Sequence, residues 1–220
     1  EVDAAINGAA LYRNGTVDVA DLKSLPALPE TAIEVAQVAA SFAAAQASVV
    51  LLGEDATELR VREASAAQPD VILFATHGLL GGEMGGLREP ALVLTPPELI
   101  EHPSDDGLLL ASELAQLRIA ARFVVLSACN SAAGRAEAAP PYTGLTNAFL
   151  GSGSETLMLS HWRVRDDAAA RLTIEATRRV GAGLAPSAAL QQAQLSLMAD
   201  ETIPGSAHPA TWAPFVIIGE

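Results

Sequence analysis

The run Phe123–Leu126 limits how this chain can fold more than any other feature of its sequence. Its four residues are all apolar, and a turn of small and polar residues follows, which contains the single cysteine, Cys129. A short apolar run of this kind is typical of a strand buried on both faces, as in parallel α/β sheets. The run Val71–Thr76 has the same design and leads to His77. We therefore expect two buried strands that end beside a histidine and a cysteine.

Helical and strand patterns alternate along the rest of the chain. Thr31 and Glu34 have the spacing of a capping box, which predicts the start of a helix at Thr31. Further helices are expected at 55–67, 110–117, 143–150, 166–180 and from Pro186 onward, and further strands at 49–52, 91–95, 156–160 and 215–218. This alternation predicts an α/β fold with a mostly parallel sheet and helices on both faces. We expect one domain over residues 1–220, of which 1–29 form a loop-rich segment with a short helix near 19–22.

The composition restricts the functions that the chain can have. Its formal net charge is −13 at pH 7, whereas nucleic-acid and anionic-membrane surfaces need clustered Lys and Arg. No apolar stretch reaches the roughly 18 residues of a membrane span. The four histidines and one cysteine lack zinc-site spacing, and no phosphate-binding glycine fingerprint is present. We therefore expect no cofactor, no metal, no nucleic acid and no membrane partner.

Two further expectations concern the cellular location of the protein and whether the sequence is part of a longer one. One cysteine excludes an internal disulfide framework and fits a reducing compartment, which favours a cytoplasmic location. The sequence opens with Glu1 and has neither an initiator Met nor a signal-peptide pattern. We expect it to be a piece of a longer protein.

Nucleophilic catalysis is the chemistry that the two strand ends favour. In open α/β sheets, sites form beyond the carboxyl ends of the strands, so neighbouring strands would bring His77 and Cys129 to one edge. A thiol nucleophile requires a base at such a distance. The histidine precedes the cysteine by 52 positions, and the corresponding separation in caspases is about 50. The alternatives are a small buried hydrophobe for Cys129 and a strand-end residue bonded to backbone for His77.

With these motifs the chain resembles the CHAT domain family of caspase-like, separase-related cysteine peptidases of clan CD. The resemblance rests on the segments 28–31, 51–57, 74–78, 106–109, 125–130, 160–167 and 208–219. The chain departs from the family after the cysteine, where many members have an acidic residue and Thr-Gly in place of 130–132. Family domains also begin with a further hydrophobic strand, for which residues 1–29 offer no convincing match.

The resemblance implies a three-layer caspase-like sandwich that acts as a cysteine endopeptidase. The thiolate of Cys129 would attack the scissile carbonyl, and His77 would transfer a proton to the leaving amine. The backbone N–H groups of Gly78 and Cys129 would bind the oxyanion. The partner would be a protein or peptide substrate. Regulatory helical repeats would precede the domain, as they do in family members that are often bacterial.

Asp166 and Asp167 are candidates for an acidic pocket that selects a basic P1 residue, since relatives in the clan often use one. Ordinary helix N-capping is the alternative role of both residues. Two other functions stay open for the chain as a whole. One is a catalytically inactive interaction or scaffold module, and the other is an α/β domain that binds a small ligand.

Overall fold

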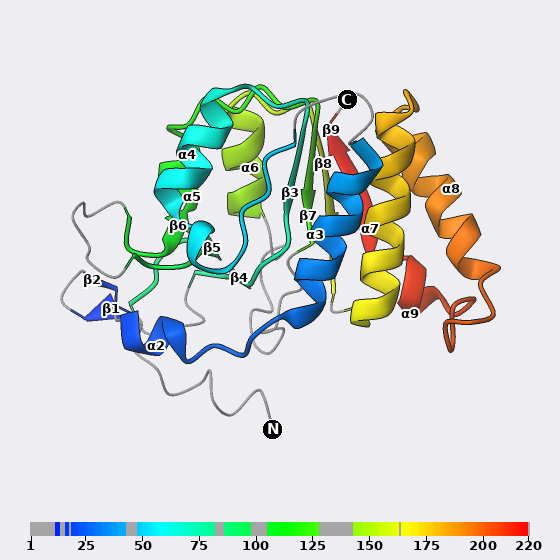
Figure 1. Ribbon diagram of the computed structural model, residues 1–220, viewed down its shortest axis with the longest axis horizontal. Helices are drawn as coiled ribbons and strands as arrows, with labels where there is room; N and C mark the ends of the chain where they lie inside the picture. The colour runs from blue at the N-terminus through cyan, green and yellow to red at the C-terminus, as the bar shows by residue number, and fades with distance from the viewer. Residues whose placement is uncertain are drawn as a thin grey trace.

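A four-stranded sheet forms the centre of the computed structural model, which describes residues 12–13, 16–17, 19–42, 48–81, 86–97, 105–127, 143–162 and 164–219. Its strands are β3 (Val71–Phe74), β7 (Phe123–Leu126), β8 (Thr156–Ser160) and β9 (Phe215–Gly219), in that order. The pairs β3–β7 and β7–β8 are parallel, and β9 runs antiparallel to β8 (Figure 1). The sheet is therefore mostly parallel, as expected.

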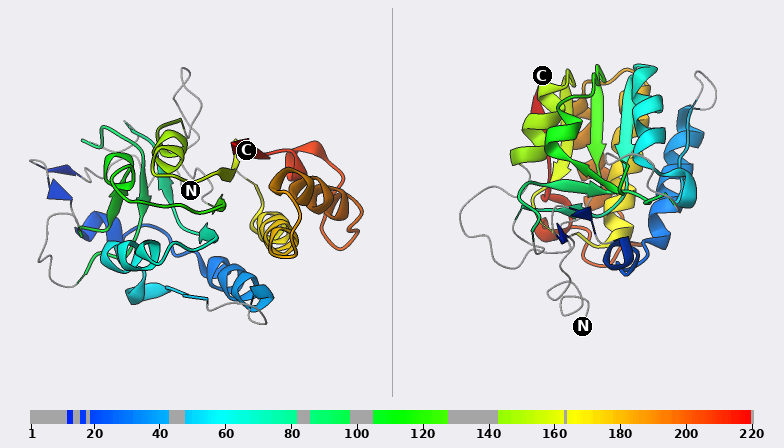
Figure 2. Two further views of the ribbon diagram at one scale, coloured as in Figure 1. Left: turned by 90° about the horizontal axis from the view of Figure 1, so that it is seen from above. Right: turned by 90° about the vertical axis from the view of Figure 1, so that its left-hand side faces the viewer.

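Helices cover both faces of this sheet (Figures 1 and 2). One face carries α4 (Glu58–Ala66), α5 (Ala111–Leu114) and α6 (Thr143–Gly151). The other carries α7 (Asp166–Gly181) and α8 (Pro186–Met198), with α3 (Pro29–Phe42) beside α7. Successive residues of a strand point to opposite faces. In β7, Val124 and Leu126 accordingly pack against the first group, and Phe123 and Val125 pack against the second. Burial on both faces explains why the run is apolar throughout, and the three-layer α/β architecture is confirmed.

A second sheet of three short antiparallel strands adjoins the first. It consists of β4 (Gly78–Leu79), β5 (Ala91–Val93) and β6 (Leu108–Leu110), with β5 in the middle. Its own apolar cluster includes Leu22 from α2 (Val19–Lys23). The remaining elements are β1 (Tyr12–Arg13), β2 (Thr16–Val17), η1 (Gly53–Asp55) and α9 (Pro209–Trp212). Among the described residues, no helix is both long enough and apolar enough to cross a membrane.

The strand expected at residues 49–52 is wrong. These residues form no strand, and Val49, Val50 and Leu52 are between 40% and 66% exposed. Together with β3 and α3 they line an apolar groove, so a gap separates them from the edge of β3. An apolar run becomes a strand only when a neighbouring strand pairs with its backbone. Among the described residues, β3 pairs with β7 alone.

The capping box expected at Thr31 and Glu34 is also wrong. The helix α3 begins at Pro29, whose fixed φ suits the first turn of a helix. The hydroxyl of Thr31 donates a hydrogen bond to the carbonyl oxygen of Leu28 at 2.7 Å, so it does not cap the helix. Glu34 therefore lies in the second turn, where its side chain is buried instead of exposed at a helix start.

Candidate active site at the carboxyl edge of the sheet

The ends of β3 and β7 lie side by side at one edge of the sheet. Their register pairs residues that are 52 positions apart, from Val71 with Phe123 to Phe74 with Leu126. The pairing continues beyond β7, since the backbone N–H of Ser127 donates to the carbonyl oxygen of Phe74 at 2.9 Å. This offset equals the separation between the two predicted catalytic residues. His77 is described, whereas Cys129 lies outside the described residues.

His77 follows β3 by three residues, and contacts on two sides hold it. The residue is 9% exposed, and Nε2 of its imidazole lies 2.8 Å from the carbonyl oxygen of Pro26. Its own carbonyl oxygen accepts a hydrogen bond from the N–H of Val93, at 2.9 Å, which fixes its backbone to β5. A carbonyl can only accept, so Nε2 carries the hydrogen and Nδ1 of the neutral ring keeps its lone pair. The ring is thus oriented to accept a proton at Nδ1.

The contact with Pro26 comes from a segment that the sequence did not single out. Pro26 lies between α2 and α3, where the chain passes the end of β3. Its carbonyl oxygen can also stabilise the positive charge of a protonated imidazole, because that charge strengthens the Nε2–H hydrogen bond. Every residue has such a main-chain carbonyl group. No residue type in a sequence therefore indicates this contact with the His77 ring.

Gly78, the expected oxyanion residue, is the first residue of β4 and is buried. It lies opposite Leu92 in the antiparallel ladder with β5. Adjacent pairs in such a ladder alternate between hydrogen-bonded and non-bonded. Because His77 and Val93 form a bonded pair, the alternation turns the N–H of Gly78 away from β5. This group is therefore directed to the side of β4 that has no strand neighbour among the described residues.

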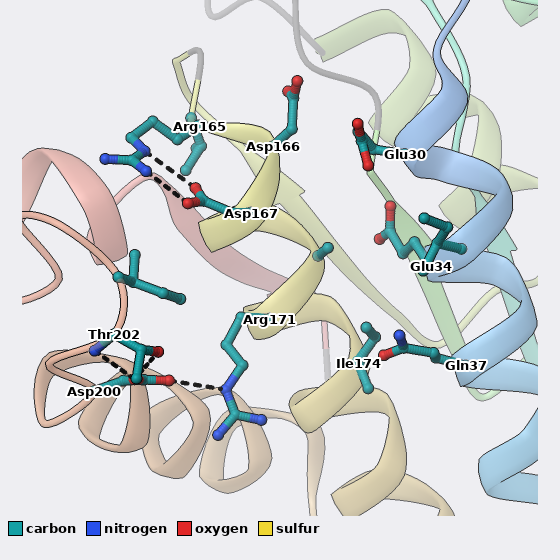
Figure 3. A pocket seen from close by; sticks show the side chains of 14 residues that line it. Glu30, Glu34, Gln37, Arg165, Asp166, Asp167, Arg171, Ile174, Asp200 and Thr202 are labelled. Atoms are coloured by element: carbon teal, nitrogen blue, oxygen red, sulfur yellow. Dashed lines mark hydrogen bonds and ion pairs between the residues drawn. The ribbon is translucent and has the colours of Figure 1, made fainter.

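Asp166 and Asp167 line a cavity of about 980 Å³ between the first turns of α3 and α7 (Figure 3). Their surroundings differ. Arg165 donates to both carboxylate oxygens of Asp167, at 3.1 and 2.6 Å, and this ion pair lowers the pKa of Asp167. Asp166 instead lies on the side of the cavity where Glu30 and Glu34 project from α3. The structure therefore brings Asp166 together with two acidic residues that the sequence did not connect with it.

Glu34 forms the buried wall of this cavity and is only 4% exposed. Its Oε2 accepts a hydrogen bond from the hydroxyl of Ser127 at 3.1 Å, which joins α3 to the end of β7. Its Oε1 is buried, and the buried hydroxyl of Thr173 in α7 acts on the same carboxylate as a second hydrogen-bond donor. Burial raises the pKa of Glu34, while hydrogen bonds from the hydroxyls of Ser127 and Thr173 act in the opposite direction. The negative charge of Asp166, the smallest of these effects, also raises this pKa.

A family model of the CHAT domain matches residues 7–220. The chain belongs to the CHAT domain family. The caspase-like α/β fold expected from the resemblance agrees with the three-layer architecture and the mostly parallel sheet. Within the described part of this CHAT domain, no group of three or more His, Cys, Asp or Glu side chains could hold a metal ion.

Two curated proteins are similar to this CHAT domain. Tetratricopeptide repeat protein 28 of Mus musculus and that of Homo sapiens are each 29% identical to it over 203 residues. Each alignment covers 77% of this chain, while the chain spans only 8% of the length of either relative. Both relatives are named for tetratricopeptide repeats. Both are also eukaryotic, whereas the resemblance led us to expect a bacterial protein.

Proposed function

We propose that this CHAT domain is a cysteine endopeptidase in which Cys129 is the nucleophile and His77 is its proton-transfer partner. The observation that carries the proposal is the hydrogen bond between Nε2 of His77 and the carbonyl oxygen of Pro26, at the edge where β3 and β7 end. It fixes the orientation and the tautomer of the ring, which a proton-transfer residue requires. The same bond suits an inert strand-end histidine bonded to backbone, so the proposal rests on this bond together with the 52-residue register of β3 and β7.

The reaction would proceed through a thioester. The Cys129 thiolate attacks the scissile carbonyl carbon, the carbon–nitrogen bond breaks, and His77 gives its proton to the departing amine. A water molecule then loses a proton to His77, attacks the thioester carbon and releases the carboxylic acid and the thiolate. The backbone N–H groups of Gly78 and Cys129 would stabilise the oxyanion of each tetrahedral intermediate, where one such donor is worth about 3 kcal/mol.

Asp166 and Asp167 would select the substrate by an acidic pocket for a basic P1 side chain. Both line the cavity beside the end of β8, close in sequence to the strand edge where the proposed chemistry takes place. In a longer protein, helical repeats would flank the domain and regulate access to it. The tetratricopeptide repeats named in its two curated relatives support this arrangement.

Cleavage profiling of a peptide library tests the proposal. We expect the parent to cleave peptides and Cys129→Ala to lose this activity by at least about a thousandfold, because the nucleophile is absent. His77→Gln should lower kcat by a similar order while the far-UV circular dichroism spectrum stays unchanged.

A Cys129→Ala protein that cleaves the same peptides as the parent would refute the mechanism. No cleavage by the parent, combined with a cysteine that iodoacetamide does not alkylate at neutral pH, would instead favour an inactive interaction or scaffold module.

A further inference from the structure

Ser127 follows β7 directly and lies two positions before Cys129 in the sequence. Side chains of a strand alternate between its two faces, and Phe123 and Val125 of β7 pack on the side of α7. Ser127 continues this alternation, and its hydroxyl donates to Oε2 of Glu34 at 3.1 Å. A hydrogen bond therefore replaces apolar packing at the point where the strand ends.

Glu34 interacts with a second hydroxyl, which belongs to α7. Thr173 is fully buried in that helix, and its hydroxyl acts on the Glu34 carboxylate as a hydrogen-bond donor. Figure 3 shows Glu34 projecting from α3 towards α7. One buried side chain thus joins α3, the end of β7 and α7. Because its carboxylate is charged, it binds each hydroxyl more strongly than a neutral acceptor would.

The segment that leads into α3 also holds the histidine. The carbonyl oxygen of Pro26 lies 2.8 Å from Nε2 of His77, and α3 begins three positions after Pro26, at Pro29. Glu34 lies in the second turn of the same helix and contacts the end of β7. The start of α3 is therefore bonded to both of the strand ends that the proposed reaction uses.

A carboxylate is an unfavourable choice if Glu34 only joins these elements. Burial raises its pKa, and the two hydroxyls counteract this effect only in part. Apolar groups of the same shape can replace both partners of a buried hydrogen bond with little loss of stability. Functional sites, by contrast, often keep groups that reduce stability. The buried carboxylate is therefore better explained by a function than by packing.

We propose that Glu34 is a positioning residue, which holds the end of β7 through Ser127 so that Cys129 lies within reach of His77. This role rests on the proposed endopeptidase function. Glu34 acts through Ser127 and takes no part in making or breaking bonds. Catalysis is sensitive to such positioning, because a displacement of about 1 Å can lower a rate about a hundredfold.

The rate at which iodoacetamide alkylates Cys129 at pH 7 tests this role, because the reagent has no side chain for an acidic pocket to select. Glu34→Ala removes the acceptor of the Ser127 hydroxyl, so we expect alkylation to slow at least about fivefold. Glu34→Gln keeps an acceptor oxygen and should stay within about twofold of the parent. Both variants remove the negative charge, so the difference between them measures the hydrogen bond.

Ser127→Ala should slow alkylation as much as Glu34→Ala does. The double variant should be no slower than either single one, because the two residues act through one contact. Circular dichroism should show that all these variants keep the folded structure of the parent.

Thr173→Val and Thr177→Val form a matched pair on α7. Both changes remove a fully buried hydroxyl and keep a branched side chain. Thr177 lies one turn further along the helix, and its hydroxyl has no hydrogen-bond partner among the described residues. We expect Thr173→Val to slow alkylation about threefold, because it weakens the hold on Glu34. Thr177→Val should change the rate by less than about 1.5-fold.

A Glu34→Ala variant that reacts as fast as the parent, while His77→Gln reacts more slowly, would overturn this assignment and leave the proposed peptidase. Glu34→Gln as slow as Glu34→Ala would also overturn it, because the charge and not the hydrogen bond would then be responsible. Equal slowing by the two threonine variants would point to a general loss of packing and would overturn it too. Equal rates for the parent and His77→Gln would instead remove the proposed function, together with the role of Glu34 that rests on it.

Discussion

Glu58 and Glu34 are both buried carboxylates on helices that flank the sheet, but backbone N–H groups and an arginine hold the first, whereas hydroxyl groups hold the second. Glu58, in α4, is fully buried, and its Oε1 accepts hydrogen bonds from the N–H groups of Asp106 and Gly107, each at 2.9 Å. Its Oε2 lies 3.4 Å from the guanidinium of Arg62. Glu34 has the hydroxyls of Ser127 and Thr173 as partners and lines a cavity.

The difference separates a strongly held structural carboxylate from a weakly held one. Glu58 joins α4 to the loop before β6, and its partners offset part of the unfavourable burial of its charge. Glu34 interacts with two neutral hydroxyls and with no backbone N–H group or arginine among the described residues. Stability should therefore depend more on Glu58 than on Glu34.

Glu58→Ala should produce the largest change in stability. It leaves two backbone N–H groups without an acceptor, so we expect the free energy of unfolding to fall by about 3 kcal/mol. Glu34→Gln keeps an acceptor for Ser127 and removes a buried charge, so its effect should stay below about 1 kcal/mol. Urea denaturation of both variants measures the contrast. Equal losses would show that both carboxylates are structural.

The pH dependence of unfolding sharpens the account of Glu58. Burial raises its pKa from 4.5 to about 7, despite hydrogen bonds from the backbone that act in the opposite direction. A raised pKa means that the folded state binds the proton more tightly. The stability it contributes is thus complete below pH 4.5 and is lost as the pH rises through 7.

We therefore expect the parent to lose stability relative to Glu58→Gln between these two values, by about 2 kcal/mol. Asp106, whose pKa burial raises to about 6, and Glu34 shift in the same direction, and both are present in each protein. Measuring the difference between the two proteins therefore isolates Glu58. Parallel pH profiles would show that its proton is bound equally in the folded and unfolded states.

The smallest effects on stability are expected for substitutions of Asp166 and Asp167. Asp167→Asn breaks an ion pair with Arg165 in which both side chains are about half exposed, so it should cost about 0.5 kcal/mol. Asp166→Asn breaks no ion pair among the described residues and should leave the free energy of unfolding unchanged within about 0.5 kcal/mol. In cleavage after a basic P1 residue, Asp166→Asn should have a larger effect than Asp167→Asn, because Arg165 already pairs with Asp167. A larger effect of Asp167→Asn would assign the pocket mainly to Asp167.

The sequence predicted those parts of the fold that burial determines. In β3 and β7, continuous apolar runs indicated parallel strands, and their neighbouring positions follow from the register of Phe74 with Leu126. The run at 49–52 is equally apolar but forms no strand, because strand formation also depends on a backbone partner that hydrophobicity does not encode. β4 and β6 have only two and three residues, too few for a period to show.

For a similar reason, the sequence indicates only some of the residues that form the candidate site. His77 was identifiable because it follows the end of a strand, and Asp166 because it begins a helix after a strand. Pro26 acts through its main-chain carbonyl, which is common to all residues. Glu34 matched a capping pattern with Thr31, and only the position of Pro29 as the first residue of the helix shows that it lies a turn deeper. A sequence pattern cannot distinguish these two positions, which differ in burial.

Activation of the thiol by the oriented imidazole is the central claim, and the rate of alkylation by iodoacetamide at pH 7 tests it most directly. The chain has a single cysteine, so mass spectrometry assigns the product to Cys129. A free thiol has a pKa near 8.5 and reacts through its small thiolate fraction. We predict that the parent reacts at least about tenfold faster than His77→Gln, because the histidine favours the thiolate. Equal rates in the two folded proteins, at the rate of an ordinary thiol, would contradict the claim.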